Sequence, residues 1–186
     1  EAIGYKGITG TSARTIALWF KTSTSGTQMP LVVYGDSSGG GSLSWLAMGA
    51  SNKAAFGWGG AIMNAGSGLT DGAWHHLAVT IPDNGTSGDV VLYVDGVGTN
   101  GSGSTPINTN ASGDVRLGYG NGGNYFTGQL DDVRFYDSAL SASEISALAN
   151  PGAAPEPAET FAFLGLLTAF GLGFREWRSR RKAKVS

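Results

Sequence analysis

The chain consists of short segments rich in β-branched and aromatic residues, which recur at close intervals between clusters of Gly, Ser, Asn and Asp. Eight such segments lie at residues 14–22, 30–35, 42–49, 53–58, 73–81, 89–94, 114–119 and 128–136. No helical periodicity separates them, so consecutive segments are expected to pair as antiparallel strands joined by tight turns. The pattern predicts an all-β fold, either a sandwich or a barrel.

The first segment indicates how such strands are buried. Thr15, Ala17, Trp19 and Lys21 share one face of this strand, and Ile16, Leu18 and Phe20 share the other. Both faces carry apolar residues, which suits a strand in a stack of two sheets whose outer faces are partly covered. We therefore expect an antiparallel two-sheet sandwich.

One short helix is expected after the last strand. Ser141 and Glu144 have capping-box spacing, in which each side chain satisfies a backbone N–H at the start of the helix. Ile145 and Leu148 form its apolar stripe, and the Asn-Pro-Gly sequence at 150–152 ends it. The helix is expected to cap the sandwich.

The charged residues divide the chain into an acidic body and a basic end. Residues 1–152 contain six Lys or Arg against eleven Asp or Glu, and all later basic residues follow Phe174. Such a body offers no basic face for phosphates, so nucleic acid is not expected as a partner. The absence of cysteine excludes disulfides and thiol nucleophiles.

Three segments follow the body. Residues 153–159 are rich in Ala, Pro and Glu, which favours an extended linker. Residues 160–174 are uncharged, and as a helix they would be about 22 Å long, short of the roughly 30 Å hydrocarbon core. Trp177 and the basic side chains would extend this reach. We expect a transmembrane helix and a basic cytoplasmic tail over 160–186; a core helix or an unstructured end is the alternative.

The tail resembles a known sorting signal. Its elements, in order, are the motif Pro155-Glu156-Pro157, an apolar stretch bounded by Phe161 and Phe174, and the cluster Arg175, Arg178, Arg180 and Arg181. This order resembles the PEP-CTERM signal of Gram-negative bacteria that export polysaccharide. The resemblance implies sorting by an exosortase, a transient inner-membrane anchor, and a final location in the cell envelope or on the cell surface.

Four motifs of the body resemble a second family. They are DGAWHHLAVT at 71–80, LYVDG at 92–96, FTGQLDDVRFY at 126–136 and ALSASEI at 139–145. Together they resemble the LamG-like jelly-roll, or concanavalin A-like lectin/glucanase, family. The resemblance implies a jelly-roll sandwich over residues 1–152, a fold that serves lectins, adhesion modules and glycosidases alike.

The residues of the body do not favour catalysis. A glycosidase needs two carboxyl groups across the scissile bond, and glucanases of this fold carry Glu-x-Asp-x-Glu on one strand. The glutamates of the body are Glu1 and Glu144, and Glu144 is assigned to the helix cap. Asp131 and Asp132 are adjacent, and we expect them on opposite faces of a strand. The body is therefore expected not to be an enzyme.

The two histidines are neighbours in the sequence. Adjacent residues of a strand point to opposite faces, so His75 and His76 cannot jointly hold one metal ion without distortion. We expect both to be structural.

Carbohydrate binding would use an exposed aromatic ring as a stacking platform. The candidates, which lie in or beside Gly-rich loops, are Tyr34, Trp45, Trp58, Tyr119 and Tyr125. The alternative for each is packing in the core.

Calcium is the cofactor that the resemblance implies, held by Asp, Asn and backbone oxygens in loops. No ligand set is assigned, and the candidate side chains are Asp36, Asp83, Asn84, Asp89, Asn121 and Asn124.

These observations support one hypothesis and leave two alternatives. The hypothesis is a non-catalytic, exported cell-envelope protein that binds a glycan, an extracellular polysaccharide or matrix. The alternatives are a structural surface protein without a small ligand and a degenerate glycoside hydrolase.

Overall fold

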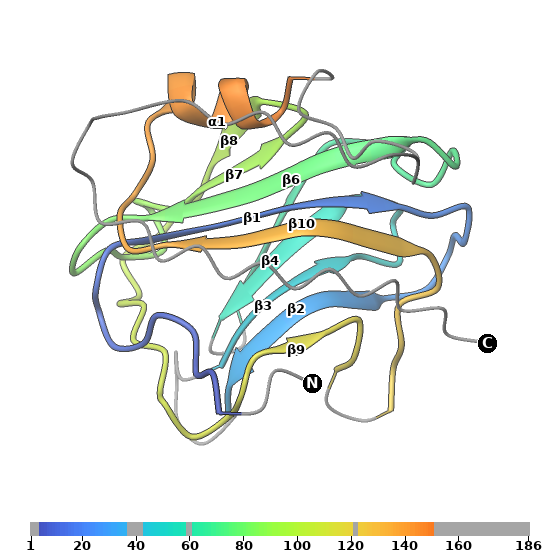
Figure 1. Cartoon of the computed structure of the whole chain (residues 1–186). Coiled ribbons are helices and arrows are strands. Elements are labelled where there is room, and N and C mark those ends of the chain that lie inside the picture. The colour runs from blue at the N-terminus through green and yellow to red at the C-terminus, as the bar shows by residue number, and fades with distance from the viewer. Residues whose placement is uncertain (1–3, 37–42, 59–60, 121–122, 151–186) are drawn as a thin grey trace, which may run out of the picture.

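The computed structural model describes residues 4–36, 43–58, 61–120 and 123–150. Two antiparallel five-stranded sheets stack face to face, and one short helix lies on the outside (Figure 1). The first, here called the β1 sheet, has the order β10-β1-β6-β7-β8. The second, the β3 sheet, has the order β5-β4-β3-β2-β9. The predicted all-β, two-sheet antiparallel sandwich is confirmed.

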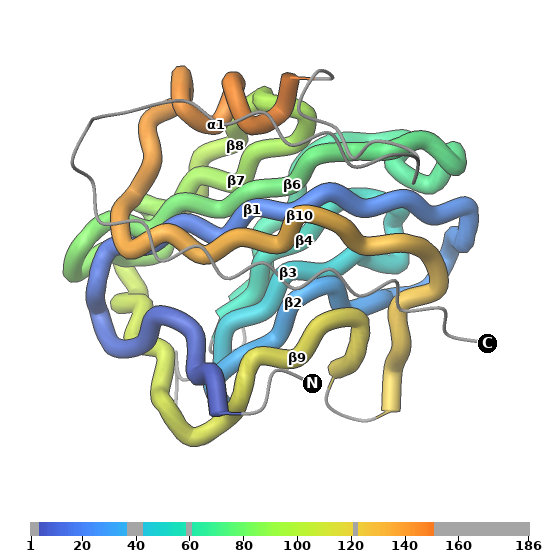
Figure 2. Tube along the Cα trace, viewed as in Figure 1, coloured from blue at the N-terminus to red at the C-terminus, as the bar shows by residue number. Residues whose placement is uncertain are grey.

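The bounds of the elements show which segments build each sheet. The β1 sheet contains β1 (Arg14–Lys21), β6 (Trp74–Ile81), β7 (Val91–Val94), β8 (Val97–Asn100) and β10 (Gln129–Tyr136). The β3 sheet contains β2 (Met29–Gly35), β3 (Leu43–Met48), β4 (Ala54–Trp58), β5 (Ala61–Ala65) and β9 (Arg116–Leu117). Figure 2 follows the chain from β9 to β10, which returns to lie beside β1.

Alternation along the strands divides inner from outer residues. β1 pairs with β6 from Arg14 opposite Ile81 to Lys21 opposite Trp74. Ile16, Leu18 and Phe20 are at most 1 % exposed and face the core between the sheets. The apolar side chains that meet them from the β3 sheet include Leu31, Leu46 and Phe56. The two-face pattern predicted for this strand is confirmed.

Two strands were not expected from the sequence. β5 lies directly beyond the segment assigned to β4, and β8 overlaps a stretch whose Gly, Ser, Thr and Asn content suggested a turn. β8 is exposed at all four positions, so no buried face marks it in the sequence. It is a strand because its backbone pairs with β7 across the turn at Asp95 and Gly96, both of which have positive φ.

The helix α1 (Ala142–Leu148) begins as predicted. The Ser141 hydroxyl accepts a hydrogen bond from the Glu144 backbone N–H, and the Glu144 carboxylate accepts one from the Ser141 backbone N–H. Ile145 is fully buried and packs with Ala17, Ala78 and Tyr93 on the outer face of the β1 sheet. α1 therefore covers part of that face (Figure 1).

The predictions for the tail lie outside the described residues. They concern the motif at Pro155, Glu156 and Pro157, the apolar stretch from 160 to 174, and the arginine cluster that follows. Within the part of the chain that the structure describes, no helix has the length and apolar character needed to cross a membrane.

Candidate functional site

The aromatic candidates of the sequence separate into core and surface residues. Tyr34 is fully buried, and its hydroxyl accepts a hydrogen bond from Arg14 Nε at 3.1 Å. Trp58 is 2 % exposed and stacks on Phe56 with ring centroids 5.3 Å apart. Both side chains pack in the core, so neither offers a ring face to a ligand.

Trp45 lies on the outer face of the β3 sheet and is half-buried. A β-carbon at Gly57 would lie 2.1 Å from Cε2 and Cζ2 of the Trp45 ring, so the indole lies directly over this glycine. Gly57 is the residue opposite Trp45 on β4. The missing side chain lets the ring lie against the sheet backbone.

Trp45 belongs to a row of residues that crosses all five strands of the β3 sheet. Cross-strand pairing aligns Arg116 of β9 with Val33 of β2, Val33 with Trp45, Trp45 with Gly57, and Gly57 with Ile62 of β5. These five residues are called the outer row below. Val33 is only 4 % exposed, whereas Ile62 is 57 % exposed at the far edge.

Two tyrosines lie beside one end of the outer row. Tyr119 and Tyr125 are 37 % and 56 % exposed, and their ring centroids are 5.1 Å apart. A backbone bridge joins the same two residues, so the loop between them is closed at its base. The Arg116 guanidinium lies over the Tyr119 ring, 5.9 Å from its centroid. The loop thus places an exposed aromatic pair at the edge of the β3 sheet.

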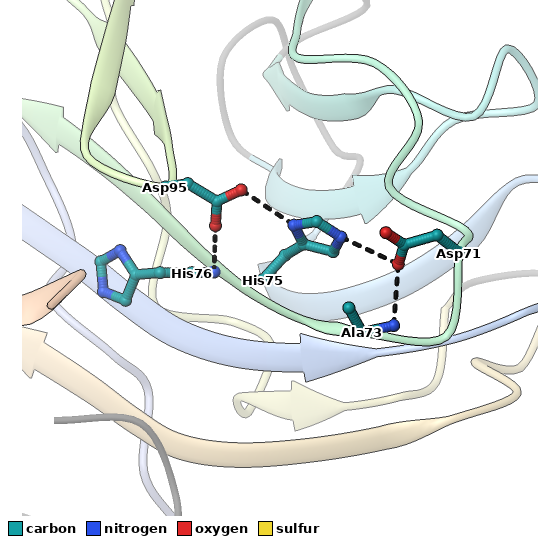
Figure 3. Close-up of polar contacts among 5 residues, drawn as sticks. All are labelled: Asp71, Ala73, His75, His76 and Asp95. Atoms are coloured by element: carbon teal, nitrogen blue, oxygen red, sulfur yellow. Dashed lines mark hydrogen bonds and ion pairs between the residues drawn. The ribbon is translucent and has the colours of Figure 1, made fainter. Parts of the chain in front are cut away.

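The β1 sheet carries a cluster of polar side chains centred on His75. Its Nδ1 lies 2.8 Å from Asp95 Oδ2, and its Nε2 lies 3.2 Å from Asp71 Oδ1 (Figure 3). Burial opposes the charge of the ring, but hydrogen bonds to Asp95 and Asp71 outweigh it and raise the pKa of His75. The two carboxylates lie on opposite edges of the imidazole and do not converge on one point, so the arrangement joins two turns rather than forming a metal centre.

His76 points to the other side of β6 (Figure 3), as the sequence predicted. It is 2 % exposed, packs edge-on against Trp19 at 5.3 Å, and its Nδ1 lacks a hydrogen-bond partner. Burial lowers the pKa of His76 to about 4, so the ring is neutral near pH 7. A shallow pocket here is lined by Ala17, Trp19, His76, Asp132, Arg134 and Leu148.

The expectation that Asp131 and Asp132 lie on opposite faces is wrong. Asp132 has a φ of 52° at a bulge that shifts the β1–β10 register. Asp131 pairs with Trp19, and Asp132 lines the same outer pocket as Trp19. Alternation holds only for a regular strand, and the bulge breaks it. Asp132 accepts two hydrogen bonds from Arg134, at 2.9 and 2.6 Å.

The candidate calcium ligands lie in different loops, except that Asp83 and Asn84 share one turn. Asp36 accepts a hydrogen bond from the Asn110 side-chain amide, and Asp83 accepts one from the Asn84 side-chain amide. Asp89 accepts hydrogen bonds from the backbone N–H and the hydroxyl of Thr86. Asn121 lies outside the described residues. Among residues 4–36, 43–58, 61–120 and 123–150, no three or more His, Asp or Glu side chains gather in a group that could hold a metal ion.

Comparison with known proteins identifies the fold. A sequence model described as the concanavalin A-like lectin/glucanases superfamily matches residues 2–146. None of the curated proteins matches the sequence. The resemblance of the body motifs to this family is thereby confirmed.

Solved structures give the same fold. One is domain 4 of AbnA, an extracellular GH43 arabinanase from Geobacillus stearothermophilus, in complex with arabinotriose; it has 22% identity and a TM-score of 0.56, covering 77% of this chain and 68% of that chain. Another is the Ruminococcus gnavus IT-sialidase CBM40 bound to α2,3 sialyllactose, with 13% identity, a TM-score of 0.62 and coverage of 76% and 84%. A third is Trypanosoma rangeli sialidase, with 20% identity, a TM-score of 0.54 and coverage of 75% and 22%.

Proposed function

The chain belongs to the concanavalin A-like lectin/glucanases superfamily, and from this premise we propose that it is a non-catalytic, exported protein that binds carbohydrate. The observation that carries the proposal is the set of aromatic rings on and beside the outer face of the β3 sheet. Trp45 lies against the sheet, and Tyr119 and Tyr125 form an exposed pair at its edge. Aromatic faces of this kind stack on the apolar faces of sugar rings, while nearby polar groups bond the hydroxyls.

Two of the similar structures support this proposal by their ligands. The arabinanase domain was solved with arabinotriose and the CBM40 domain with sialyllactose. Two other proteins with this fold therefore bind a saccharide. Fold alone does not assign a ligand, so the aromatic face of this chain remains the main argument.

A glycan array, probed with and without calcium, tests the proposal. The full chain is expected to bind at least one class of glycan, and Tyr125→Ala is expected to weaken that binding about tenfold because an aromatic contact is lost. Val97→Ala, on the far edge of the β1 sheet, is the control and should bind normally. Calcium dependence would support the implied cofactor. A chain that binds no glycan under either condition would instead be a structural surface protein.

The absence of catalysis is part of the proposal. Glu144 is engaged in the cap of α1, and Asp132 is paired with Arg134. Neither carboxyl group is available as a general acid opposite a second carboxylate, which glycoside hydrolysis requires. Incubation with labelled β-glucans, arabinans and sialosides should therefore release no product. Turnover that disappears in Asp132→Asn would identify a hydrolase and overturn this part of the proposal.

Export and sorting by an exosortase complete the proposal. They rest on the order of the Pro155-Glu156-Pro157 motif, the apolar stretch and the terminal arginines. In a host without exosortase, the full chain should stay in the membrane fraction with its body accessible to protease from outside. Coexpression of an exosortase should shorten the chain near the motif, as measured by mass spectrometry. Full-length protein in the soluble fraction of the first host would contradict the anchor.

A further inference from the structure

We propose that the outer row binds a neutral, linear polysaccharide chain laid across the strands, and that Gly57 is the positioning residue that holds Trp45 flat for stacking. The inference rests on the proposed function and specifies its ligand class and geometry. Two observations support the inference. The first is the contact between Trp45 and Gly57, and the second is the alignment across the β3 sheet of Arg116, Val33, Trp45, Gly57 and Ile62.

The contact between Trp45 and Gly57 sets the orientation of the indole. Any side chain at position 57 would begin where the ring now lies, because its β-carbon would be 2.1 Å from two ring atoms. The backbone of Gly57 does not have positive φ, so its conformation does not require glycine. The glycine is therefore explained by the space that the ring occupies. A substituted residue would displace the ring from the sheet.

The length of the outer row favours an extended ligand. Four strand spacings separate β9 from β5, which is about 19 Å and several times the width of one sugar ring. The row ends at the exposed Ile62 on one side, and the Tyr119–Tyr125 pair lies beyond Arg116 on the other. Apolar contacts are thus available at the centre and at both ends. A single terminal sugar would use only one of them.

The charge of the sheet favours a neutral ligand. Within the strands that the structure describes, the β3 sheet carries one charged residue, Arg116. Its guanidinium lies over the Tyr119 ring. A face with one cation offers little to a polyanion, which is held by several positive charges, and it offers no carboxylate to a cationic chain. Stacking and hydrogen bonds remain as the main binding contributions.

Ladders of oligosaccharides test the ligand class. Isothermal titration of the full chain would use cello-, xylo- and arabino-oligosaccharides from the monosaccharide to the hexamer, with polygalacturonate as the acidic probe. At least one neutral ladder should gain affinity tenfold or more from monomer to tetramer and then level off, with little effect of salt. Equal affinity for monomer and hexamer, no binding to any neutral ladder, or salt-sensitive binding to polygalacturonate alone would overturn the inference.

A double-mutant cycle tests the role of Gly57. Trp45→Ala and Gly57→Ala should each weaken binding of the best oligosaccharide by tenfold or more, and Trp45→Phe should retain part of it. Gly57→Ala should have no further effect in the Trp45→Ala background, because it acts through the indole. Trp74→Ala removes a half-buried tryptophan from the β1 sheet and should bind normally. Melting temperatures verify that each variant is folded.

The results also separate this inference from the proposed function. Binding on the glycan array that is unaffected by Trp45→Ala, or additive losses in the double mutant, would overturn the inference and leave carbohydrate binding in place. No binding on the array would remove the proposed function itself. If Gly57→Ala does not fold, Trp45→Ala and Trp45→Phe still decide whether the ring stacks on the ligand.

Discussion

At the scale of single residues, His75 and His76 behave oppositely although they are neighbours on β6. His75 lies between two carboxylates, and their hydrogen bonds raise its pKa despite burial. His76 lies on the other face, where burial and the nearby Arg134 lower its pKa to about 4 against the attraction of Asp95 and Asp132. A protonated His75 stabilises the fold, whereas protonation of His76 requires a charge in a buried site.

The two shifts predict opposite slopes of stability with pH. The contribution of His75 is complete below its unfolded pKa of 6.5 and is lost as the pH rises through its raised folded pKa. As the pH falls, the unfolded state protonates His76 at a higher pH than the folded state does. The fold therefore loses roughly 3 kcal/mol of stability between pH 6.5 and about pH 4. The two histidines together favour maximum stability near pH 6.5.

Urea unfolding at pH 6.5 and pH 4.5 measures this effect. His76→Phe should lose less stability between the two pH values than the wild type, because a neutral ring replaces a group that must take up a proton. His75→Gln is the control from the opposite face, and it should keep the acid-side loss of the wild type. Equal acid-side losses in the wild type and His76→Phe would show that His76 does not carry this dependence.

At the scale of elements, α1 is a helix that depends on its surroundings. It has seven residues, fewer than the dozen or more that an isolated helix needs in water. The capping box at Ser141 and Glu144 satisfies its first backbone groups, and the burial of Ile145 attaches it to the β1 sheet. The partly buried Leu140 and Leu148 pack against the same cluster.

Removal of the cap should measurably loosen α1. Ser141→Ala is expected to lower the free energy of unfolding by about 1 kcal/mol, the usual cost of losing such a cap. Hydrogen exchange of the α1 amides should increase in parallel. Ser146→Ala, at an exposed position inside the helix, should leave both unchanged or slightly improved. A Ser141→Ala chain with wild-type exchange would mean that the contacts of Ile145 alone hold the helix.

At the scale of the whole molecule, hydrogen bonds from Arg14 connect parts of the sandwich that are distant in sequence. It is fully buried on β1 and bonds Tyr34 of the β3 sheet and Thr109 of the loop before β9. It also donates to the backbone carbonyls of Gly10 and Ser12. Among the residues that the structure describes, these acceptors are all neutral oxygens, so hydrogen bonds rather than an ion pair satisfy the guanidinium.

Substitution of Arg14 should destabilise the entire sandwich. Arg14→Ala should cost about 3 kcal/mol or more, because it leaves several buried acceptors without donors. Arg14→Lys should restore little, since one ammonium cannot reproduce the planar fork. Thr109→Val removes a single partner and should cost less. Urea unfolding followed by fluorescence measures all three. Near wild-type stability in Arg14→Lys would show that the charge matters more than the fork.

The sequence by itself determined the strands with buried faces other than β5, the start of α1 and the opposite orientations of His75 and His76. These features depend on neighbours within a few residues, and local periodicity and capping spacing express them directly. β8 and the bulge at Asp132 were missed because backbone pairing, with no side-chain pattern of its own, creates them. Tyr34, Trp45 and Trp58 look alike beside Gly-rich loops, yet two are in the core and one is outside.

Only the tertiary structure decided which of these aromatic residues lie in the core and which lies on the outer face of the β3 sheet. The outer row joins β9, β2, β3, β4 and β5, and its members come together through the register of four strand pairs. A shift of one residue in any pair would turn the following side chains to the other face of the sheet. Registers are set by packing across the whole core, which is why Gly57 could not be matched to Trp45 before the fold was known.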